Sequence, residues 1–505
     1  SNYPDNLVKE FIQISAENGI DVFRIFDSLN WIETMKLPIE EALKTGKIVE
    51  GAICYTGDIT SPNETKYTLD YYVKMAKELE SLGCHSIAIK DMAGLLKPLA
   101  AKELISTLKR ELHVPLHLHT HDSTGNGVST VMMAAEAGVD IVDLAIESMS
   151  SLTSQPSMNA VAEALRGTRR DTGLKPEELT ELSHYYSRVR EVYAPFESDM
   201  KSPNTEIYKY EIPGGQYSNL LAQVTSMGSP DDFEAIKGLY KDANDLLGNI
   251  VKVTPTSKAV GDLAIFMYKN GLTKDNILTE GTGLSYPDSV VSYFQGMMGQ
   301  PYGGFPKELQ KIVLKDIEPL TDRPGKSLPP VDFEAIKKHL IEKYNYGDKS
   351  KEVMNQKAIS YALYPKVYED YCEHFQMYND VTRLESHVYF YGLRKGEETY
   401  LNIGEGKQLL IKYLEEGEPD ENGIRTLTFQ VNGMLRTVKI QDKNLEIKAD
   451  RKLKADKTNP QHLGSSIPGT VGKVLVKEGD AVTENMPLLT VEAMKMETTV
   501  VSKIT

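Results

Sequence analysis

Short apolar runs alternate with amphipathic stretches over the first third of the chain. Between residues 5 and 166, runs rich in valine and isoleucine recur, each followed by polar residues: 22–26, 49–55, 86–89, 116–118 and 141–146. The stretches between them, such as residues 71–82 and 100–112, have apolar positions at helical spacing. Strands that alternate with helices in this way predict parallel βαβ units.

The polar residues at the ends of these runs are spaced as in a (β/α)8 barrel. Each unit of a barrel of about 250 residues takes about 31 residues. Here Asp27, Thr56, Lys90, His121 and Glu147 follow one another at intervals of 29, 34, 31 and 26 residues. We therefore predict an α/β fold with about five of the eight units of a TIM barrel, whose catalytic groups lie at the carboxyl ends of the strands. The competing fold is a doubly wound open sheet, but no glycine-rich phosphate loop follows a strand.

The remaining two thirds of the chain divide into regions that differ in predicted secondary structure and composition. Residues 175–317 read as mostly helical, with polar loops at 211–216 and 252–258, and the proline-rich residues 319–330 read as a linker. A helical stretch then runs to about residue 376. Strand patterns follow at residues 388–391, 408–413, 425–431 and 436–440. We expect domains at 1–317, 331–442 and 462–505, the last all-β, with a lysine-rich tether at 443–461.

Composition and charge narrow the range of partners. The 505 residues include 57 Lys and Arg against 72 Asp and Glu, a net charge of −15 that would repel nucleic acid and anionic lipid. The cysteines Cys54, Cys84 and Cys372 form no C-x-x-C pair, which excludes a disulfide framework. No apolar run is long enough for a membrane span. We expect no nucleic-acid or membrane partner and a reducing compartment, the cytoplasm of a bacterium or the mitochondrial matrix of a eukaryote.

Two histidines at the end of one predicted strand suggest a metal site. His119 and His121 are two residues apart, so an extended strand places both imidazoles on one face, where they can reach one Mn, Fe, Co or Zn ion. The alternative is a pair of polar residues at a strand end, without a metal. Lys90 favours the metal, because a buried lysine can lose its charge and react with CO2 to give a carbamate that binds metal.

Lys495 is a candidate for covalent modification. It lies between Met494 and Met496 in a strand-rich region, and an isolated M-K-M would normally be a surface turn. The segments P-G-T-V and K-E-G-D precede it, and together they resemble the biotinyl domain of biotin-dependent carboxylases. That resemblance implies that Lys495 carries biotin. Only ten residues follow Lys495, so we expect a biotinyl half-domain that is truncated at its C-terminus.

The whole chain resembles the pyruvate carboxylase family. The resemblance rests on six motifs, at residues 23–30, 89–96, 118–122, 153–157, 211–217 and 253–255. It implies a carboxyltransferase domain with a helical funnel at 1–317, a mixed α+β extension and tetramerisation region at 331–442, and the biotin carrier at 462–505. The chain starts without Met, and we expect it to be a fragment whose first barrel strands are missing.

The resemblance also assigns site residues. Lys90, carbamylated, together with His119 and His121, would bind Mn or Zn, and Thr254 would relay a proton between pyruvate and biotin. The family's fourth metal ligand, an aspartate, and its substrate-binding arginine belong to segments before residue 1. Read alone, a threonine before proline shapes a turn.

Further family positions surround the cofactor. Gln216, Ser257 and Lys258 match residues around the biotin ring, and Asp27 matches a position at the mouth of the active site. Read alone, a glutamine after two glycines is a loop residue.

The resemblance implies the activity of a biotin-dependent ligase, pyruvate carboxylase. In that reaction carboxybiotin gives its CO2 to the enolate of pyruvate, which forms oxaloacetate. The reaction is a step of anaplerosis and gluconeogenesis. The implied partners are an absent biotin carboxylase domain that uses ATP and bicarbonate, a biotin protein ligase, acetyl-CoA as activator and the other chains of a homotetramer. We expect the chain alone to be inactive. Two alternatives stay open: an oxaloacetate decarboxylase α subunit or transcarboxylase subunit, and a non-catalytic biotin carrier or assembly fragment.

Overall fold

Five parallel strands form the first sheet of the computed structural model, paired in chain order from β1 to β5. They are β1 (Val22–Ile25), β2 (Ile48–Cys54), β3 (Ser86–Asp91), β4 (Leu116–Thr120) and β5 (Ile141–Val142). The prediction of consecutive parallel βαβ units of a TIM-barrel type is thereby confirmed, with β5 shorter than its apolar run suggested.

The structure describes residues 2–197, 200–226, 232–345, 351–420, 422–442, 455, 459, 461–465, 470–493 and 496–503. The chain divides into two units. One comprises Ser1–Glu334 together with Ser465–Thr505, and the other comprises Ala335–Gly464.

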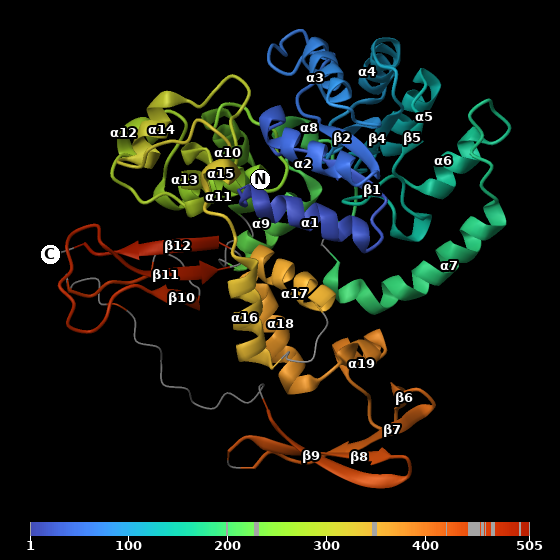
Figure 1. The fold of residues 1–505 in the computed structure, drawn as a ribbon, viewed down its shortest axis with the longest axis vertical. Helices are drawn as coiled ribbons and strands as arrows, with labels where there is room; N and C mark the ends of the chain where they lie inside the picture. Colours follow the sequence, from blue (N-terminus) through green and yellow to red (C-terminus); the bar gives the residue numbers. More distant parts are fainter. Residues whose placement is uncertain are drawn as a thin grey trace. The chain divides into compact units, whose positions relative to one another are not determined.

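Helices connect the strands and cover the outer face of this sheet (Figure 1). They are α2 (Ile32–Lys44), α3 (Leu69–Ser81), α4 (Pro98–Glu111) and α5 (Gly127–Ala137), with α1 (Asp5–Glu17) packed on α2. The helices predicted at 71–82 and 100–112 correspond to α3 and α4. Each begins with a typical start signal: the hydroxyl of Thr68 accepts a hydrogen bond from the backbone N–H of Tyr71, and Pro98 occupies the first position of α4.

The sheet has one apolar and one polar face. Apolar side chains such as Val49, Ile53, Ile87, Ile89 and Leu118 point toward the helices and form the first hydrophobic core. Residues at the alternate positions include Arg24, Glu50, Ser86 and His117, which bond to one another on the opposite face. The predicted apolar strand runs therefore carry several polar or charged residues on the face opposite the helices, beside small residues such as Ala52 and Ala88.

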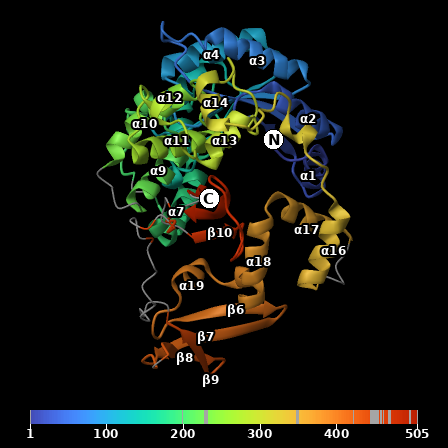
Figure 2. The ribbon, with the colours of Figure 1, turned by 90° about the vertical axis from the view of Figure 1, so that its left-hand side faces the viewer.

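A bundle of helices follows the sheet in the same unit (Figure 2). Its members and the connecting helices are α6 (Met158–Leu165), α7 (Pro176–Tyr193), α8 (Ile207–Tyr210), α9 (Gly214–Ser226), α10 (Phe233–Leu246), α11 (Thr256–Asn270), α12 (Ile277–Glu280), α13 (Asp288–Gln295), α14 (Lys307–Leu314) and α15 (Pro324–Ser327). They enclose a second hydrophobic core around Tyr240, Leu263, Tyr293 and Phe294.

The two polar loops predicted in this region are shorter than expected. Helix α9 starts at Gly214, inside 211–216, and α11 starts at Thr256, inside 252–258. In each case a proline stands directly before the helix, and its carbonyl accepts the first helical hydrogen bonds. Gln216, Ser257 and Lys258 therefore lie in the first turns of helices, rather than in loops.

The proline-rich residues 319–330 are held against the start of the chain, which corrects their interpretation as a simple linker. The guanidinium of Arg323 donates to both carboxylate oxygens of Asp5, at 3.0 and 2.9 Å. The side-chain amide of Asn6 exchanges two hydrogen bonds with the backbone of Val331, at 2.9 and 3.0 Å. Sequence composition carried no sign of these contacts, because both partners lie more than three hundred residues away.

The second unit combines helices with an antiparallel sheet. Its elements are α16 (Phe333–Tyr344), which leads into it, α17 (Lys351–Leu363), α18 (Pro365–Tyr378), α19 (Ser386–Tyr391), β6 (Glu398–Gly404), β7 (Lys407–Glu416), β8 (Ile424–Val431) and β9 (Met434–Gln441). The strand predicted at 388–391 was wrong, because these residues form α19. Its backbone closes helical hydrogen bonds from Tyr389 to Glu385 and from Gly392 to Val388, and Gly392, with φ +70°, ends it.

The C-terminal segment is all-β in its described residues, as predicted. Strands β10 (Thr470–Val474), β11 (Pro487–Ala493) and β12 (Met496–Val501) form an antiparallel sheet. Lys495, between β11 and β12 in the sequence, lies outside the described residues, as does most of the predicted tether at 443–461.

Candidate functional site

The structure brings the three predicted metal ligands together at the carboxyl ends of two neighbouring strands. Lys90 on β3 and His119 on β4 are direct partners in the parallel register. The imidazole of His121 follows on the same face, and its Nε2 lies 3.3 Å from the Nε2 of His119. Both Nε2 atoms therefore face the same point in space, as two nitrogen ligands of one ion would.

Each of these imidazoles is held through its other ring nitrogen. Nδ1 of His119 lies 2.8 Å from Oδ2 of Asp143, and Nδ1 of His121 lies 2.7 Å from the backbone carbonyl oxygen of Thr153. Both oxygens are acceptors, so each Nδ1 carries the donated proton, and Nε2 is the ring atom that can bind a metal. Burial lowers the pKa of His121 to about 4, which keeps its ring neutral. This donor set fits a divalent transition metal.

Lys90 completes the cluster. Burial lowers the pKa of its ammonium group, and its Nζ lies 4.9 Å from the centre of the Phe26 ring. In the described part of the chain it has no ion-pair partner, and no three His, Cys, Asp or Glu side chains gather as a metal site there. An uncharged lysine can react with CO2 to form a carbamate, whose oxygen would be a metal donor beside the two imidazoles.

The sequence did not predict a layer of charged side chains beneath the cluster, in which Glu50 and His117 are buried and Arg24 and Asp143 are half-buried. Arg24 donates to Oε1 of Glu50 at 2.5 Å, and Oε2 of Glu50 lies 2.8 Å from Nδ1 of His117. Nε2 of His117 lies 2.8 Å from Oδ1 of Asp143. Burial alone would lower the pKa of His117, but the two carboxylates outweigh it and raise that pKa to about 9. The ring is therefore an imidazolium between two anions. The charged residues at alternate strand positions were the available signal.

The loop that contains Thr254 is tied to the end of the sheet. Thr254 itself is exposed. Two residues earlier, the buried ammonium of Lys252 lies 2.6 Å from Oε2 of Glu211 and 3.3 Å from Oγ1 of Thr56, just after β2. Lys252 thus links the two polar loops of the helical region to the carboxyl edge of the sheet, a role that the sequence did not indicate.

The start of α9 is packed against the loop that holds His121. A Cβ placed on Gly214 would lie 3.1 Å from the side chain of Thr153, the residue whose carbonyl binds His121. Two residues on, the amide of Gln216 lies against the backbone of α11, because a Cβ on Gly261 would be 2.4 Å from its Nε2. The position of Gln216 therefore depends on a glycine in the facing helix.

The other predicted residues have different local roles. Lys258 pairs with Asp262 at 2.6 Å, and Ser257 is buried beside it in α11. The buried carboxylate of Asp27 accepts hydrogen bonds from the N–H groups of Leu29 and Trp31, at 2.8 and 3.0 Å. Asp27 thus shapes the loop between β1 and α2.

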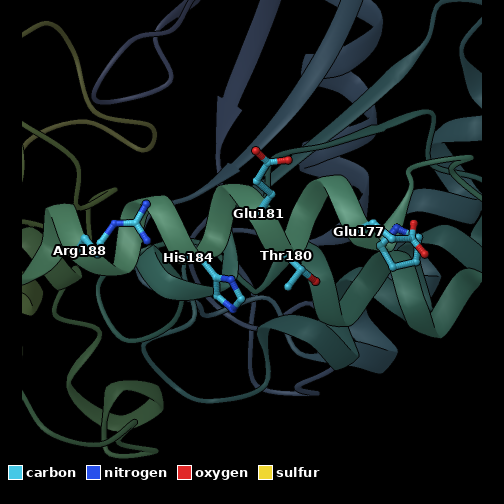
Figure 3. A pocket seen from close by; sticks show the side chains of 6 residues that line it. Glu177, Thr180, Glu181, His184 and Arg188 are labelled. Carbon is cyan, nitrogen blue, oxygen red and sulfur yellow. The ribbon is translucent and has the colours of Figure 1, made fainter.

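A groove outside the predicted site lies on a different element. Figure 3 shows a groove along α7 whose lining includes Glu177, Thr180, Glu181, His184 and Arg188. All of them come from one helix, and none belongs to the predicted site. The described helices include none that is both long and apolar enough to cross a membrane.

Three family models match consecutive parts of the chain. The model described as HMGL-like matches residues 34–185, the conserved carboxylase domain matches residues 207–412, and the model for a biotin-requiring enzyme matches residues 461–505. The first covers four of the five parallel strands, and the last covers β10 to β12.

The curated relatives and solved structures that resemble the chain are pyruvate carboxylases or parts of them. The chain is 52% identical to pyruvate carboxylase of Staphylococcus aureus (strain Mu50 / ATCC 700699) and 50% identical to that of Bacillus subtilis (strain 168), each over 500 residues, 99% of this chain and 43% of the relative. It spans less than half the length of these relatives. A carboxyl transferase domain structure of Rhizobium etli pyruvate carboxylase, solved with pyruvate and biocytin, is 44% identical with a TM-score of 0.83, covering 87% of this chain and 74% of that one.

Proposed function

Because the chain belongs to the pyruvate carboxylase family, we propose that it transfers a carboxyl group carried by biotin to pyruvate, which forms oxaloacetate. The single observation that carries this proposal is the cluster at the ends of β3 and β4, in which Lys90, His119 and His121 converge. A bound divalent ion, manganese or zinc, would supply a Lewis acid that stabilises the negative oxygen of the pyruvate enolate. Lys90, as a carbamate, and the Nε2 atoms of the two histidines would hold it.

The remaining site residues would handle the proton and the cofactor. The hydroxyl oxygen of Thr254 would accept a proton from the methyl group of pyruvate while the hydroxyl proton passes to the ring nitrogen of biotin. Its exposed position, on a loop tied to the sheet edge by Lys252, suits a group that must meet two reactants. Gln216, Ser257 and Lys258 would surround the biotin ring, which Lys495 would carry.

The wider assembly follows from the same family. We propose that a biotin carboxylase domain, which uses ATP and bicarbonate, supplies the carboxyl group and that a biotin protein ligase modifies Lys495. Acetyl-CoA as activator and a homotetramer complete this proposal. The activity is favoured over that of an oxaloacetate decarboxylase or a transcarboxylase, because the relatives that are half identical to the chain are pyruvate carboxylases.

The test separates the two half-reactions in the full-length enzyme. Lys90→Ala should abolish the decarboxylation of oxaloacetate that depends on added free biotin, while ATP cleavage that depends on bicarbonate continues. Lys97→Ala is the matched control, since this lysine pairs with Asp58 at 2.6 Å outside the cluster, and it should retain both activities. Normal biotin-dependent decarboxylation in Lys90→Ala would refute the proposed function.

A further inference from the structure

The carboxylate of Asp143 joins the metal-ligand cluster to the layer of charged side chains beneath it. Its Oδ2 accepts from Nδ1 of His119 and from Nη1 of Arg24, both at 2.8 Å, and its Oδ1 accepts from Nε2 of His117 at 2.8 Å. The backbone of Asp143 is held as well, because its N–H donates to the carbonyl of Leu118 at 3.0 Å. Both the position and the orientation of the carboxylate are therefore determined by its neighbours.

Only a carboxylate suits this place. The three neighbours of Asp143 all donate, and an ionised carboxylate is an acceptor at both oxygens. An asparagine of the same shape has one acceptor oxygen, and its NH2 group would face a donor. If the NH2 group faces His119 and Arg24, the ring of His119 can bond to it only by moving its own proton to Nε2, the atom that must stay unprotonated to bind a metal. If the NH2 group faces His117, that ring loses its acceptor, so either orientation breaks one contact that holds the side chain.

We propose that Asp143 is a positioning residue that fixes the tautomer and the ring orientation of His119, and that Arg24 and His117 in turn hold Asp143. This inference rests on the proposed function, since it concerns the same ligand cluster. The inference adds one residue to the three ligands: the affinity of the cluster for a metal would also depend on the carboxylate of Asp143, which is not itself a ligand. Substitution of a residue that bonds to a metal ligand typically lowers metal affinity about 10- to 100-fold.

The experiment measures metal binding without turnover. The full-length enzyme is freed of metal with a chelator and titrated with Co2+ in bicarbonate buffer, and the visible absorption reports both affinity and ligand geometry. Asp143→Asn should weaken Co2+ binding about 10- to 100-fold and change the absorption spectrum. Asp140→Asn is the matched control, because Asp140 lies just before β5, as Asp143 lies just after it, but bonds to Lys109 and to the N–H of Leu116, both at 2.8 Å. It should bind Co2+ as the parent does.

The outcomes separate this inference from the proposed function. If the parent binds no Co2+, the proposed metal cluster fails. If the parent binds Co2+ and Asp143→Asn binds it equally tightly with the same spectrum, the positioning role is overturned, and the proposed function stands. Arg24→Lys serves if Asp143→Asn does not fold, because a lysine cannot reach Glu50 and Asp143 with separate nitrogens. It should lose affinity, by less than Asp143→Asn, and parent affinity in this variant would equally overturn the role.

Discussion

Thr254 and Thr256 carry the same hydroxyl group two residues apart in opposite environments. Thr254 is exposed, whereas the hydroxyl of Thr256 is buried, within 2.7 Å of the carbonyl oxygen of Val251 and 2.6 Å of that of Val253. It also accepts a hydrogen bond from the N–H of Val253 at 3.2 Å. One threonine thus maintains the loop, and the other is exposed to solvent.

This contrast gives the first prediction. In the full-length enzyme, Thr254→Ala should lower oxaloacetate formation about 10²- to 10⁴-fold, the usual contribution of a positioned proton relay, with no change in thermal stability. Thr254→Ser should keep part of the activity, because it retains the hydroxyl. Steady-state assays and thermal melts measure both.

Thr256→Ala is the matched control and should behave in the opposite way. It should cost about 1–3 kcal/mol of stability, because the N–H of Val253 loses a buried partner. Equal rates for Thr254→Ala and the parent enzyme would remove Thr254 from the mechanism.

The second prediction concerns Gln216 and the glycine that faces it. Gly261→Ala would place a Cβ 2.4 Å from Nε2 of Gln216, so the glutamine side chain must move. We expect biotin-dependent decarboxylation of oxaloacetate to fall at least about tenfold, the effect of losing about 1.4 kcal/mol of binding, while metal content stays constant.

The control for this variant is Gly238→Ala on α10. A Cβ at Gly238 has no atom outside its own helix within 4 Å, so this variant should keep full activity and gain stability from the better helix former. If both alanine variants were fully active, Gln216 would have no part in binding biotin.

The third prediction tests the packing between the sheet and helix α3. Gly51→Ala in β2 would place a Cβ 2.9 Å from Sγ of Cys84 and 3.2 Å from the side chain of Leu79. Such overpacking should destabilise the chain by about 1–3 kcal/mol, seen as an earlier midpoint in denaturant unfolding. Adding Cys84→Ala removes the tightest contact. The double variant should therefore be more stable than the sum of the two single changes allows, and strict additivity would contradict this account.

The fourth prediction concerns the thiols. Burial raises the pKa of Cys54 to about 12 and that of Cys84 to about 11, and the third cysteine, Cys372, is buried as well. A thiol reagent at pH 8 should therefore leave the folded chain unmodified and react with three thiols after unfolding. A thiol that reacts quickly in the folded chain would contradict the burial seen here.

The raised pKa values of Cys54 and Cys84 also predict how the stability of the folded chain depends on pH. Between pH 9 and 11 the unfolded chain releases thiol protons that the folded chain keeps, so the folded state binds more protons and its stability falls as the pH rises. Cys84→Ala should reduce this alkaline loss, measured as the melting temperature across that range. An identical pH profile for the variant and the parent chain would show that Cys84 does not contribute.

Sequence alone determined the local features of the site. The intervals between strand ends predicted the βα units, because each unit must cross the sheet and return, which sets its length. The separation of His119 and His121 by two positions placed both rings on one face, because successive side chains of a strand alternate between its faces. Lys90 could be placed at the end of the preceding strand, because it directly follows the apolar run at residues 86–89. The motifs extended this reading to the family.

Tertiary structure alone decided which groups hold those residues. Asp143 and Thr153 bond to the two histidines from 24 and 32 residues away, and Arg24 and Glu50 come from other strands. Such pairs depend on strand order and register, which bring distant residues together, and the sequence does not show which of these residues become partners. The sequence also could not decide that residues 386–391 form a helix. A six-residue segment is too short for its apolar pattern to distinguish a helix from a strand.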